Sequence, residues 1–490
     1  MKVISGLFAL RFLPLWIAIL AIVAVLAYGL AGPIALALLL AFGALVGVGA
    51  WDLLQTRQAI RRNYPVLAHL RFFLEKIRPE IRQYFIESDT DALPYSRAQR
   101  AIVYQRAKRA LETRPLGTQL DVYAPGYEWI NHSITPTALA DHRFRIAVGG
   151  TGQQPNPGVH QLYSASVLNI SAMSFGALSA NAIRALNRGA RLGGFAHDTG
   201  EGSVSRYHRE HGGDLIWEVA SGYFGCRTPE GRFDPDKFAA QSADAQIKMI
   251  EVKLSQGAKP GHGGMLPGRK VTAEIAEARG VPVGKDCISP PYHSAFSTPI
   301  ELLNFVDTLR RLSGGKPTGI KFCVGHPWEW FAIAKAMHET QLLPDFIVVD
   351  GSEGGTGAAP LEFADHVGMP LREGLTLVKN TLVGLGLRER VRLAASGKII
   401  TGFDLARAMA LGADWCNMAR GFMFAVGCIQ AQTCHTGRCP TGVTSQDPLR
   451  QRALVVTDKA TRVASFHNAT LKALGELVAA TGLSHPRELS

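Results

Sequence analysis

Three cysteines near the C-terminal end of the chain have a spacing that suits a metal centre. Cys428, Cys434 and Cys439 follow the pattern C-x5-C-x4-C, and Pro440 comes directly after the last of them. Cysteine thiolates hold iron–sulfur clusters, and a Cys-Pro ending recurs in bacterial cluster loops. Zinc is the competing metal, but its usual CxxC pairs are absent here. The spacing therefore favours an iron–sulfur loop at 428–440, with three unligated buried thiols as the alternative.

The other cysteines and one histidine are weaker candidates. His435 could supply a nitrogen ligand, although a solvated loop histidine is the competing interpretation. Cys416 could be a fourth ligand, but it falls in an apolar run where a core thiol is expected. Cys226, Cys287 and Cys323 are isolated and are interpreted as structural. Seven cysteines are too few for a disulfide scaffold of 490 residues, so their clustering indicates chemistry in a reducing compartment.

Glycine-rich or polar segments recur along the second half of the chain. They read AMSFGALS, DTGEGSVS, QGAKPGHGGMLPG, VGHPW, DGSEGGTGAAP, ASGKIITG and ARGFMF. Glycine allows a backbone to approach a ligand closely, so the recurrence favours a bound cofactor over ordinary turns. Two of these segments, Ser396-Gly397-Lys398 and Arg420-Gly421, each combine glycine with a cation before a helical pattern, which suits a phosphate group.

The elements that must position these segments alternate between strand and helix. The expected strands are Val167–Ser171, Phe195–Asp198, Ile216–Ala220, Ile250–Leu254, Gly319–Val324, Phe346–Asp350, Val391–Ala395 and Asp414–Ala419. The expected helices include Ser179–Arg191, Pro299–Leu312, Glu329–Glu339, Leu371–Leu387 and Gly402–Leu411. Eight such repeats predict a closed (β/α)8 barrel, whose loops after the strands form the active-site face. An open doubly wound sheet is the rival fold, but no GxGxxG follows the first strand.

The N-terminal segment is predicted to be a transmembrane helical hairpin. No charged residue occurs from Phe12 to Trp51, and Gly29–Pro33 offers a turn near the middle. Forty uncharged residues suit two spans, about 11–30 and 33–51. Lys2 and Arg11 precede the hairpin, and Arg57, Arg61 and Arg62 follow it. Because positive charge favours the cytoplasmic side, we expect a multi-pass protein of the inner (cytoplasmic) membrane with its catalytic domain in the cytoplasm. A cleaved signal peptide and a buried soluble hairpin are less favoured.

The charge distribution supports this organisation. Residues 1–110 hold 14 basic and 6 acidic residues, which is most of the net charge of +12. A surplus beside an apolar segment points to membrane lipid, and no motif supports nucleic-acid binding. Residues 56–110 are predicted to contain polar amphipathic helix such as Tyr64–Tyr84, either a solvated linker or a collar on anionic headgroups. The expected parts are the hairpin at 1–55, a helical linker at 56–160 and the barrel at 161–485.

Several motifs of this sequence occur together in one known family. ISAMSFGALS, HDTGEG, QGAKPGHGGMLPG, DGSEGGTGAAP, GADWCNMARGFMFAVGCIQAQ and TCHTGRCPTGV resemble the FMN-binding synthase domain of glutamate synthase, from about Ala165 to about Leu474. The pattern is most similar to a short, membrane-anchored branch of that family. The resemblance implies an FMN barrel with a 3Fe-4S cluster, an amino-acid or 2-oxo-acid substrate and an electron donor such as ferredoxin or a reductase subunit. A homo-oligomer is compatible with it.

The resemblance also implies roles for individual residues. Cys428, Cys434 and Cys439 would hold the cluster. Lys321 would lie near the flavin N1–C2 carbonyl, and Glu201 and Lys259 would face the 2-oxoglutarate or iminoglutarate. The cofactor-binding residues would be Ala172, Met173, Ser174, Lys321, Asp350, Gly351, Gly397, Lys398, Arg420 and Gly421.

Two departures from the family pattern bear on the substrate. The family's KPGEGG reads KPGHGG at 259–264, so His262 replaces a glutamate beside the expected substrate. The second departure is the expected N-terminal anchor, which stands where the family has a cysteine nucleophile for glutamine hydrolysis. We also expect neither the NADPH domain nor the β-helix of the family in this sequence. We therefore expect ammonia and electrons to come from elsewhere.

Three functions follow from these features. The first is a membrane FMN/iron–sulfur oxidoreductase that reduces an imine of 2-oxoglutarate to glutamate or an N-substituted glutamate, or runs in reverse. The second is a membrane redox relay or amino-acid dehydrogenase that passes electrons to a partner protein or a quinone. The third is a non-catalytic scaffold, which the retained cysteines and glycine loops disfavour. An α-hydroxy acid oxidase would need a His base and an Arg pair on late strands, and this arrangement is absent from the sequence.

Overall fold

The computed structural model describes residues 10–91, 93–151 and 154–490. The chain divides into two compact units, Met1–Arg97 and Ala98–Ser490. The predicted divisions after residues 55 and 160 stay predictions, and Lys2 lies outside the described residues.

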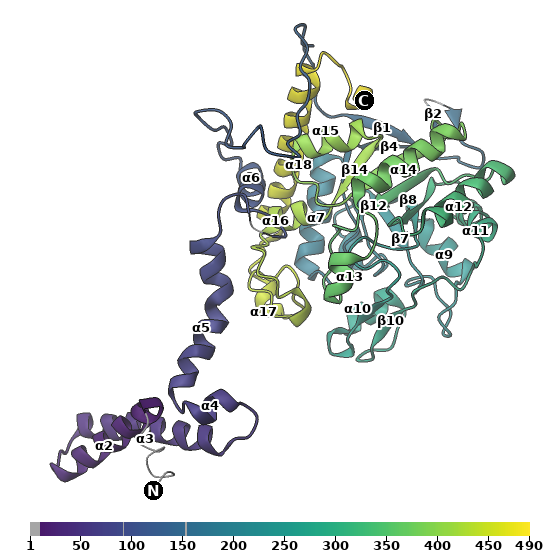
Figure 1. Cartoon of the computed structure of the whole chain (residues 1–490). Helices are drawn as coiled ribbons and strands as arrows, with labels where there is room; N and C mark the ends of the chain where they lie inside the picture. The colour runs from purple at the N-terminus through teal and green to yellow at the C-terminus, as the bar shows by residue number, and fades with distance from the viewer. Residues whose placement is uncertain (1–9, 92, 152–153) are drawn as a thin grey trace. The chain divides into compact units, whose positions relative to one another are not determined.

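A closed barrel of eight parallel strands is the centre of the larger unit (Figure 1). The strands are β5 (Leu168–Ile170), β6 (His197–Asp198), β7 (Leu215–Val219), β8 (Ile247–Lys253), β11 (Thr318–Phe322), β12 (Phe346–Asp350), β13 (Arg392–Ser396) and β14 (Trp415–Met418). They follow one another around the barrel in chain order, and β14 closes on β5. All eight overlap the predicted strands, so the predicted (β/α)8 barrel is confirmed.

The strands form here because most of their residues are apolar and buried. Every residue of β7, β11, β12, β13 and β14 is buried. Parallel strands covered on both faces read as nearly continuous apolar runs. Charged residues that interrupt such runs, such as Glu218 in LIWEV and Lys321 in TGIKF, are therefore conspicuous.

Helices surround the barrel. They include α7 (Ala180–Gly193), α9 (Pro235–Ser242), α11 (Pro299–Leu312), α12 (Pro327–Thr340), α14 (Leu371–Gly384), α15 (Gly402–Ala410), α16 (Arg420–Val426) and α18 (Val456–Ala480). Of these, α7, α11, α12, α14 and α15 overlap the five helices predicted by residue range. The start of α11 illustrates the local code: Thr298 accepts from the Glu301 amide while the Glu301 side chain accepts from the Thr298 amide. This capping box satisfies amides that a helix leaves unpaired at its N-terminus.

One long excursion from the barrel lies between β8 and α11. It contains the antiparallel pair β9 (Gly264–Leu266) and β10 (Cys287–Ser289), with η3 (Gly268–Lys270) and α10 (Ala273–Arg279) between them. The KPGHGG segment leads into it, so the excursion carries residues predicted to face the substrate.

The smaller unit contains two apolar helices that pack side by side. They are α2 (Leu13–Ala27) and α3 (Pro33–Leu54), and each span of Leu10–Ala27 and Pro33–Leu54 is long and apolar enough to cross a membrane. Gly49 permits the close contact, because a Cβ there would lie 2.6 Å from Leu15 Cδ1. The short α4 (Ala59–Asn63), the longer α5 (Leu67–Ile81) and the π-helical turn η2 (Arg82–Ile86) follow.

Candidate active site

Charged side chains from four neighbouring strands meet inside the barrel near the carboxyl ends of the strands. Asp198 ends β6, Glu218 lies on β7, Glu251 and Lys253 lie on β8, and Lys321 lies on β11. The strand register pairs Glu218 with Glu251 and Lys253 with Lys321. All five residues are buried. Such a concentration of charge in a barrel interior is expensive unless it is paired, and active sites of this fold lie at this end.

The ion pairs form a continuous chain. Lys321 Nζ donates to Glu218 Oε2 at 2.8 Å and lies 3.5 Å from Glu251 Oε1. Lys253 Nζ lies 3.0 Å from Glu218 Oε1 and donates to Glu201 Oε2 at 2.9 Å. Glu201, Lys253, Glu218 and Lys321 are therefore linked from the loop after β6 to the middle of the barrel.

The acids of this network differ in their affinity for protons. Burial raises the pKa of Asp198 to about 7 and raises the pKa of Glu251 well above its ordinary value. Burial acts in the same direction on Glu218, but the two lysines outweigh it and hold its pKa at about 2. The surrounding carboxylates likewise outweigh burial at Lys253 and Lys321 and raise both pKa values. Oxygens of Asp198, Glu218 and Glu251 lie within 4.8 Å of one another, and like charges this close in a buried site do not all ionise.

Two predicted catalytic residues approach this network from loops. Glu201 follows β6 and lies against β9, where a Cβ on Gly264 would be 2.8 Å from Glu201 Oε1. Lys259 follows β8 and is partly buried. Burial lowers the pKa of Lys259, while the Glu201 carboxylate opposes this effect. The Glu201 charge thus acts on Lys259, and the ion-pair chain joins Glu201 to Lys321.

Sequence reasoning missed four members of the network, Asp198, Glu218, Glu251 and Lys253. Their signal was present, because each is a charged residue in an otherwise apolar run expected to be a parallel strand. What the sequence lacked was the register between neighbouring strands, which sets Glu218 beside Glu251 and Lys253 beside Lys321.

The segments predicted to bind the cofactor lie on adjacent strands. Ala172, Met173 and Ser174 follow β5, Asp350 and Gly351 lie at the end of β12, Gly397 and Lys398 follow β13, and Arg420 and Gly421 begin α16 after β14. Because β12, β13, β14 and β5 are consecutive in the barrel, these segments share one sector of its mouth.

Contacts within this sector explain why some of these positions hold the residue types that they do. Asp350 Oδ2 accepts from the Gly257 amide at 2.8 Å and so ties the loop after β12 to the loop after β8. Gly397 has φ +147°, which favours glycine. A Cβ on Gly421 would lie 2.1 Å from Met418 Sδ, so its glycine is required for packing against β14.

Lys398 and Arg420 place two cations in the same part of the mouth. Burial lowers the pKa of Lys398 and the Arg420 charge lowers it further, while Glu353 and Asp365 oppose them. Arg420 Nη2 donates to the Glu353 carbonyl at 2.6 Å. Cations held together in a partly buried place favour a bound anion, because the anion relieves their repulsion.

The three cysteines of the predicted metal loop line one small cavity between Cys428 and Thr444. The Gln430 amide donates to Cys428 Sγ at 3.4 Å, and Cys439 Sγ lies 3.5 Å from Thr441 Oγ1. Burial raises the pKa of Cys428 to about 12, whereas hydrogen bonds from Thr441 and Thr444 outweigh burial and lower the pKa of Cys439. Cys416 lies buried on β14, and neither it nor His435 lines this cavity.

His262, which departs from the family pattern, is exposed. Its Nδ1 lies 2.7 Å from the Gly263 carbonyl, and its ring meets the edge of Phe363 with the centroids 5.1 Å apart.

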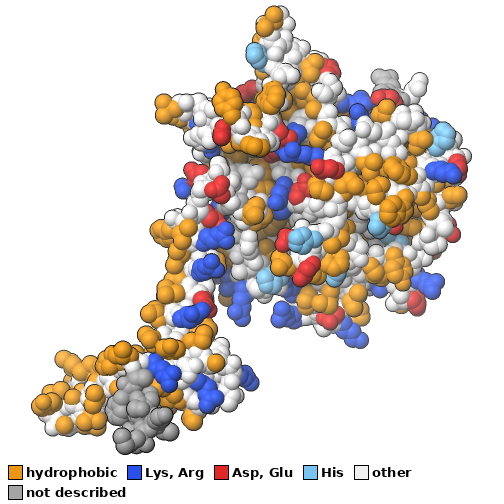
Figure 2. Space-filling view, viewed as in Figure 1, with side chains coloured by type: hydrophobic (Ala, Val, Ile, Leu, Met, Phe, Trp, Pro, Cys, Tyr) orange, Lys and Arg blue, Asp and Glu red, His pale blue; other side chains and the backbone are white. Residues whose placement is uncertain are grey.

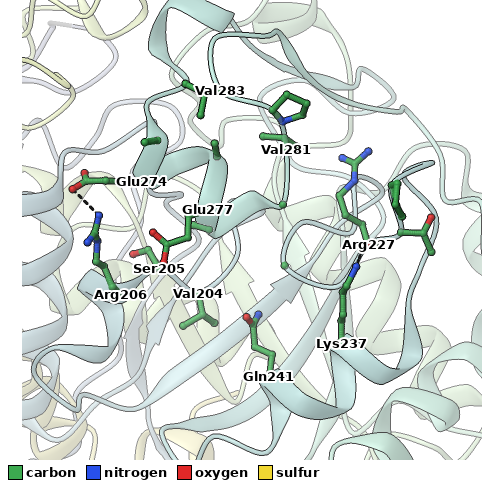
Figure 3. A pocket seen from close by; sticks show the side chains of 18 of the residues that line it. Val204, Ser205, Arg206, Arg227, Lys237, Gln241, Glu274, Glu277, Val281 and Val283 are labelled. Carbon is green, nitrogen blue, oxygen red and sulfur yellow. Dashed lines mark hydrogen bonds and ion pairs between the residues drawn. The ribbon is translucent and has the colours of Figure 1, made fainter.

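A cavity of about 890 Å³ lies away from these residues, between the loop after β6, α9 and α10 (Figure 3). None of the predicted site residues lines it. Two of its cations have acidic partners, with Arg206 2.8 Å from Glu274 and Lys237 3.3 Å from Asp234. We assign it no catalytic role.

The fold and the ionic network at its mouth define the chain as a (β/α)8-barrel enzyme. Residues 153–484 match the family described as the conserved region in glutamate synthase. The chain is 38% identical over 471 residues to the glutamate synthase large subunit-like protein YerD of Bacillus subtilis, with 89% of each chain covered. It is 36% identical to the archaeal-type glutamate synthase [NADPH] of Thermotoga neapolitana, covering 64% of this chain and 59% of that protein. The chain therefore belongs to the glutamate synthase family of oxidoreductases.

Solved structures give more distant likenesses. A mandelate oxidase variant with an FMN adduct is 14% identical, with a TM-score of 0.41 and coverage of 85% of this chain and 98% of that chain. A flavocytochrome b2 variant is 12% identical, with a TM-score of 0.40 and coverage of 86% and 84%.

Proposed function

We propose that this protein is a membrane-anchored FMN/iron–sulfur oxidoreductase that reduces an imine of 2-oxoglutarate to glutamate or an N-substituted glutamate, or catalyses the reverse. The observation that carries the proposal is the chain of ion pairs from Glu201 through Lys253 and Glu218 to Lys321, in a member of the glutamate synthase family. Electrons would come from a donor such as ferredoxin or a reductase subunit.

The mouth of the barrel suits FMN. Lys398 and Arg420 would hold its phosphate, and the segment Ala172–Ser174 with Asp350 and Gly351 would line the ring system. Lys321 would lie near the flavin N1–C2 carbonyl, where a buried ammonium favours negative charge on the reduced ring. FMN would supply hydride transfer, which no amino-acid side chain can perform.

The cysteine cavity supports a 3Fe-4S cluster, because Cys428, Cys434 and Cys439 line one small space. Each of the three thiolates would bind a different iron. Donors to the sulfurs, such as the Gln430 amide, would stabilise the negative charge.

The residues at the mouth have separable tasks in this mechanism. Lys259 would pair with a carboxylate of the dicarboxylic substrate and orient it. Glu201 would exchange a proton with the substrate nitrogen, because its carboxylate is partly exposed while Lys253 holds it in place. Lys321 would remain protonated, since Glu218 and Glu251 raise its pKa.

Membrane anchoring rests on the two apolar helices. Trp51 lies near the C-terminal end of α3 and is 67% exposed. Tyr28 directly follows α2, at the turn of the hairpin, and is 83% exposed. Aromatic residues at such positions are typical of membrane interfaces. With positive charge after α3, these features support a multi-pass protein of the inner membrane whose barrel lies in the cytoplasm.

A single preparation tests the cofactors. Anaerobically purified full-length protein should release FMN on acid treatment and give an oxidised three-iron EPR signal. The reduced protein, mixed with 2-oxoglutarate and ammonia or a primary amine, should form glutamate or its N-substituted form. Absence of both cofactors would overturn the proposal, and turnover without an amino-acid product would overturn the substrate assignment.

The anchor favours one second candidate, a redox relay or amino-acid dehydrogenase that passes electrons to a quinone or partner protein. Rapid oxidation of the reduced protein by a quinone in vesicles, with no amino-acid product, would select it.

A further inference from the structure

The smaller unit carries an amphipathic helix whose apolar side is left exposed. Four large apolar residues of α5 are between 45% and 56% exposed: Leu67, Leu70, Phe73 and Leu74. Tyr84, Phe85 and Ile86 continue the exposed apolar surface into η2, with Phe85 84% exposed. Leu67, Leu70, Leu74 and Ile81 recur at helical spacing, so these four side chains share one face of the helix.

The other sides of α5 are charged or packed. Arg71, Arg78 and Arg82 border one edge of the apolar face, and all three are exposed. Residues 67–86 hold four Lys or Arg and two Glu. Phe72, on the opposite face, is half-buried and packs under the Arg61 guanidinium, which lies 5.0 Å from its ring centroid.

The beginning of α5 is fixed to the end of α3. Asp52 is fully buried, and its carboxylate accepts from the Val66 amide at 3.0 Å and contacts His69 Nε2 at 2.9 Å. Figure 1 shows α5 running steeply across the direction of the α2–α3 hairpin. If the hairpin crosses a bilayer, a helix in this direction lies along the membrane surface at the level where α3 ends.

The distribution of side chains agrees with that direction. In Figure 2, hydrophobic side chains lie along the side of α5 toward which the hairpin extends, and Lys and Arg lie along the other side. A helix with an apolar face bounded by arginines buries that face at the boundary of headgroups and acyl chains, and its cations attract anionic lipids.

We propose that residues 67–86 lie in the headgroup region of an anionic membrane, with Leu70, Phe73 and Leu74 inserted among the acyl chains. This inference rests on the membrane anchoring proposed above. A second copy of the chain could cover the same face, but the bordering arginines and the fixed start at Asp52 favour lipid.

The test places a tryptophan on each face of α5 in the full-length protein. Phe73→Trp probes the apolar face, and Lys76→Trp is the matched control on the charged face. In vesicles of brominated phosphatidylcholine and phosphatidylglycerol, the emission added by Phe73→Trp should be quenched at least twofold more than that added by Lys76→Trp. Equal and weak quenching at both positions would overturn the proposal, as would shielding of Phe73→Trp from both brominated lipid and aqueous acrylamide, which would show that protein covers it.

Two further readouts separate the possible failures. Release of the whole protein by alkaline carbonate would refute the anchor itself, whereas retention without quenching would refute only the placement of α5. Quenching of the Phe73→Trp emission should be stronger in anionic than in neutral vesicles. Arg71→Gln, Arg78→Gln and Arg82→Gln together should abolish this difference. The control triple removes three exposed charges from the barrel unit: Lys335→Gln, Lys472→Gln and Arg143→Gln. It should leave the difference in quenching between the two kinds of vesicle unchanged. An equal loss of that difference in both triple variants would contradict a specific role for the helix.

Discussion

Lys321 shows how much of this site depends on single charges. Its ammonium lies inside the barrel, 2.8 Å from Glu218 and 3.5 Å from Glu251. Removing one partner of a buried ion pair leaves the other charge uncompensated, which costs far more than losing a surface pair. The residue is therefore expected to stabilise the fold as well as the chemistry.

We expect Lys321→Gln to lower the free energy of unfolding by about 3–5 kcal/mol, because Glu218 loses its nearest cation. Urea denaturation measures this directly. Lys335→Gln is the control, since that exposed lysine forms a surface ion pair with Glu339 one helical turn away and should change stability by less than about 0.5 kcal/mol. Equal stability of both variants would show that the network is not electrostatically coupled.

Asp198 gives a prediction that depends on pH. Its pKa is about 7 in the folded protein and near the ordinary aspartate value in the unfolded chain, so the folded state holds the extra proton between these values. Its contribution to stability is complete below the unfolded pKa and is lost as the pH rises toward 7. The stability of Asp198→Asn relative to the parent should therefore increase from pH 5 to pH 8.

Denaturation at several pH values measures this slope. Asp91→Asn is the control, because hydrogen bonds from Ser88 and Thr90 lower the pKa of Asp91 and keep it ionised throughout this range. If the difference in free energy of unfolding between Asp198→Asn and the parent stays constant with pH, Asp198 does not carry a proton in the folded protein over this range.

At the scale of elements, the loops after the strands support one another through backbone contacts. A Cβ on Gly257 would lie 1.8 Å from the Gly351 carbonyl oxygen, so the loops after β8 and β12 touch directly. The same contact brings the Gly257 amide to Asp350. Lys259 follows two residues later, which makes its position depend on this contact.

Gly257→Ala should therefore separate these loops, with a stability cost of about 1–3 kcal/mol from overpacking and at least a tenfold loss in kcat/KM. Gly325→Ala is the matched control, since the nearest atom to its added Cβ is 4.0 Å away at the end of the Glu329 side chain. Calorimetry and steady-state kinetics separate the two effects. Normal kinetics in Gly257→Ala would show that the contact does not position Lys259.

The cysteine loop gives a second prediction at this scale. Replacing Cys428, Cys434 or Cys439 by serine should each reduce bound iron to background, because each would bind a separate iron. Cys416→Ser should retain the iron, because Cys416 is buried on β14 outside the cysteine cavity. Iron analysis of the four purified variants checks this, and loss of iron only in Cys416→Ser would reverse the assignment.

At the scale of the whole molecule, the chain divides into two compact units. The barrel unit, Ala98–Ser490, contains the ionic network and the cysteines. It also contains all of α6 (Arg97–Lys108) except the first residue of that helix. Tyr104 donates to the Cys428 carbonyl at 2.7 Å, and Arg109 donates to Ser465 at 2.9 Å, so α6 belongs with the barrel.

A chain that begins at Ala98 should therefore fold and bind flavin, and should appear in the soluble fraction, whereas the full chain should remain with membranes after alkaline carbonate. Fractionation and acid-released flavin measure both properties. A shortened chain that still sediments with membranes would place the anchoring surface on the barrel.

The barrel could be predicted from the sequence because buried parallel strands and amphipathic helices have distinct local patterns, as FIVVD at Phe346–Asp350 and the capped helix Pro299–Leu312 illustrate. The segments that mark the family, and the cysteine spacing, are also local. Membership of the glutamate synthase family therefore followed from the residues alone.

Only the tertiary structure decided which charges meet. Asp198, Glu218 and Lys321 are separated by 20 and 103 residues, and nothing local in the sequence pairs them. The closure of the barrel places their strands close together, and burial then sets their proton affinities through the surrounding charges. Local patterns specify elements, whereas electrostatic coupling depends on distance in space, which the fold alone determines.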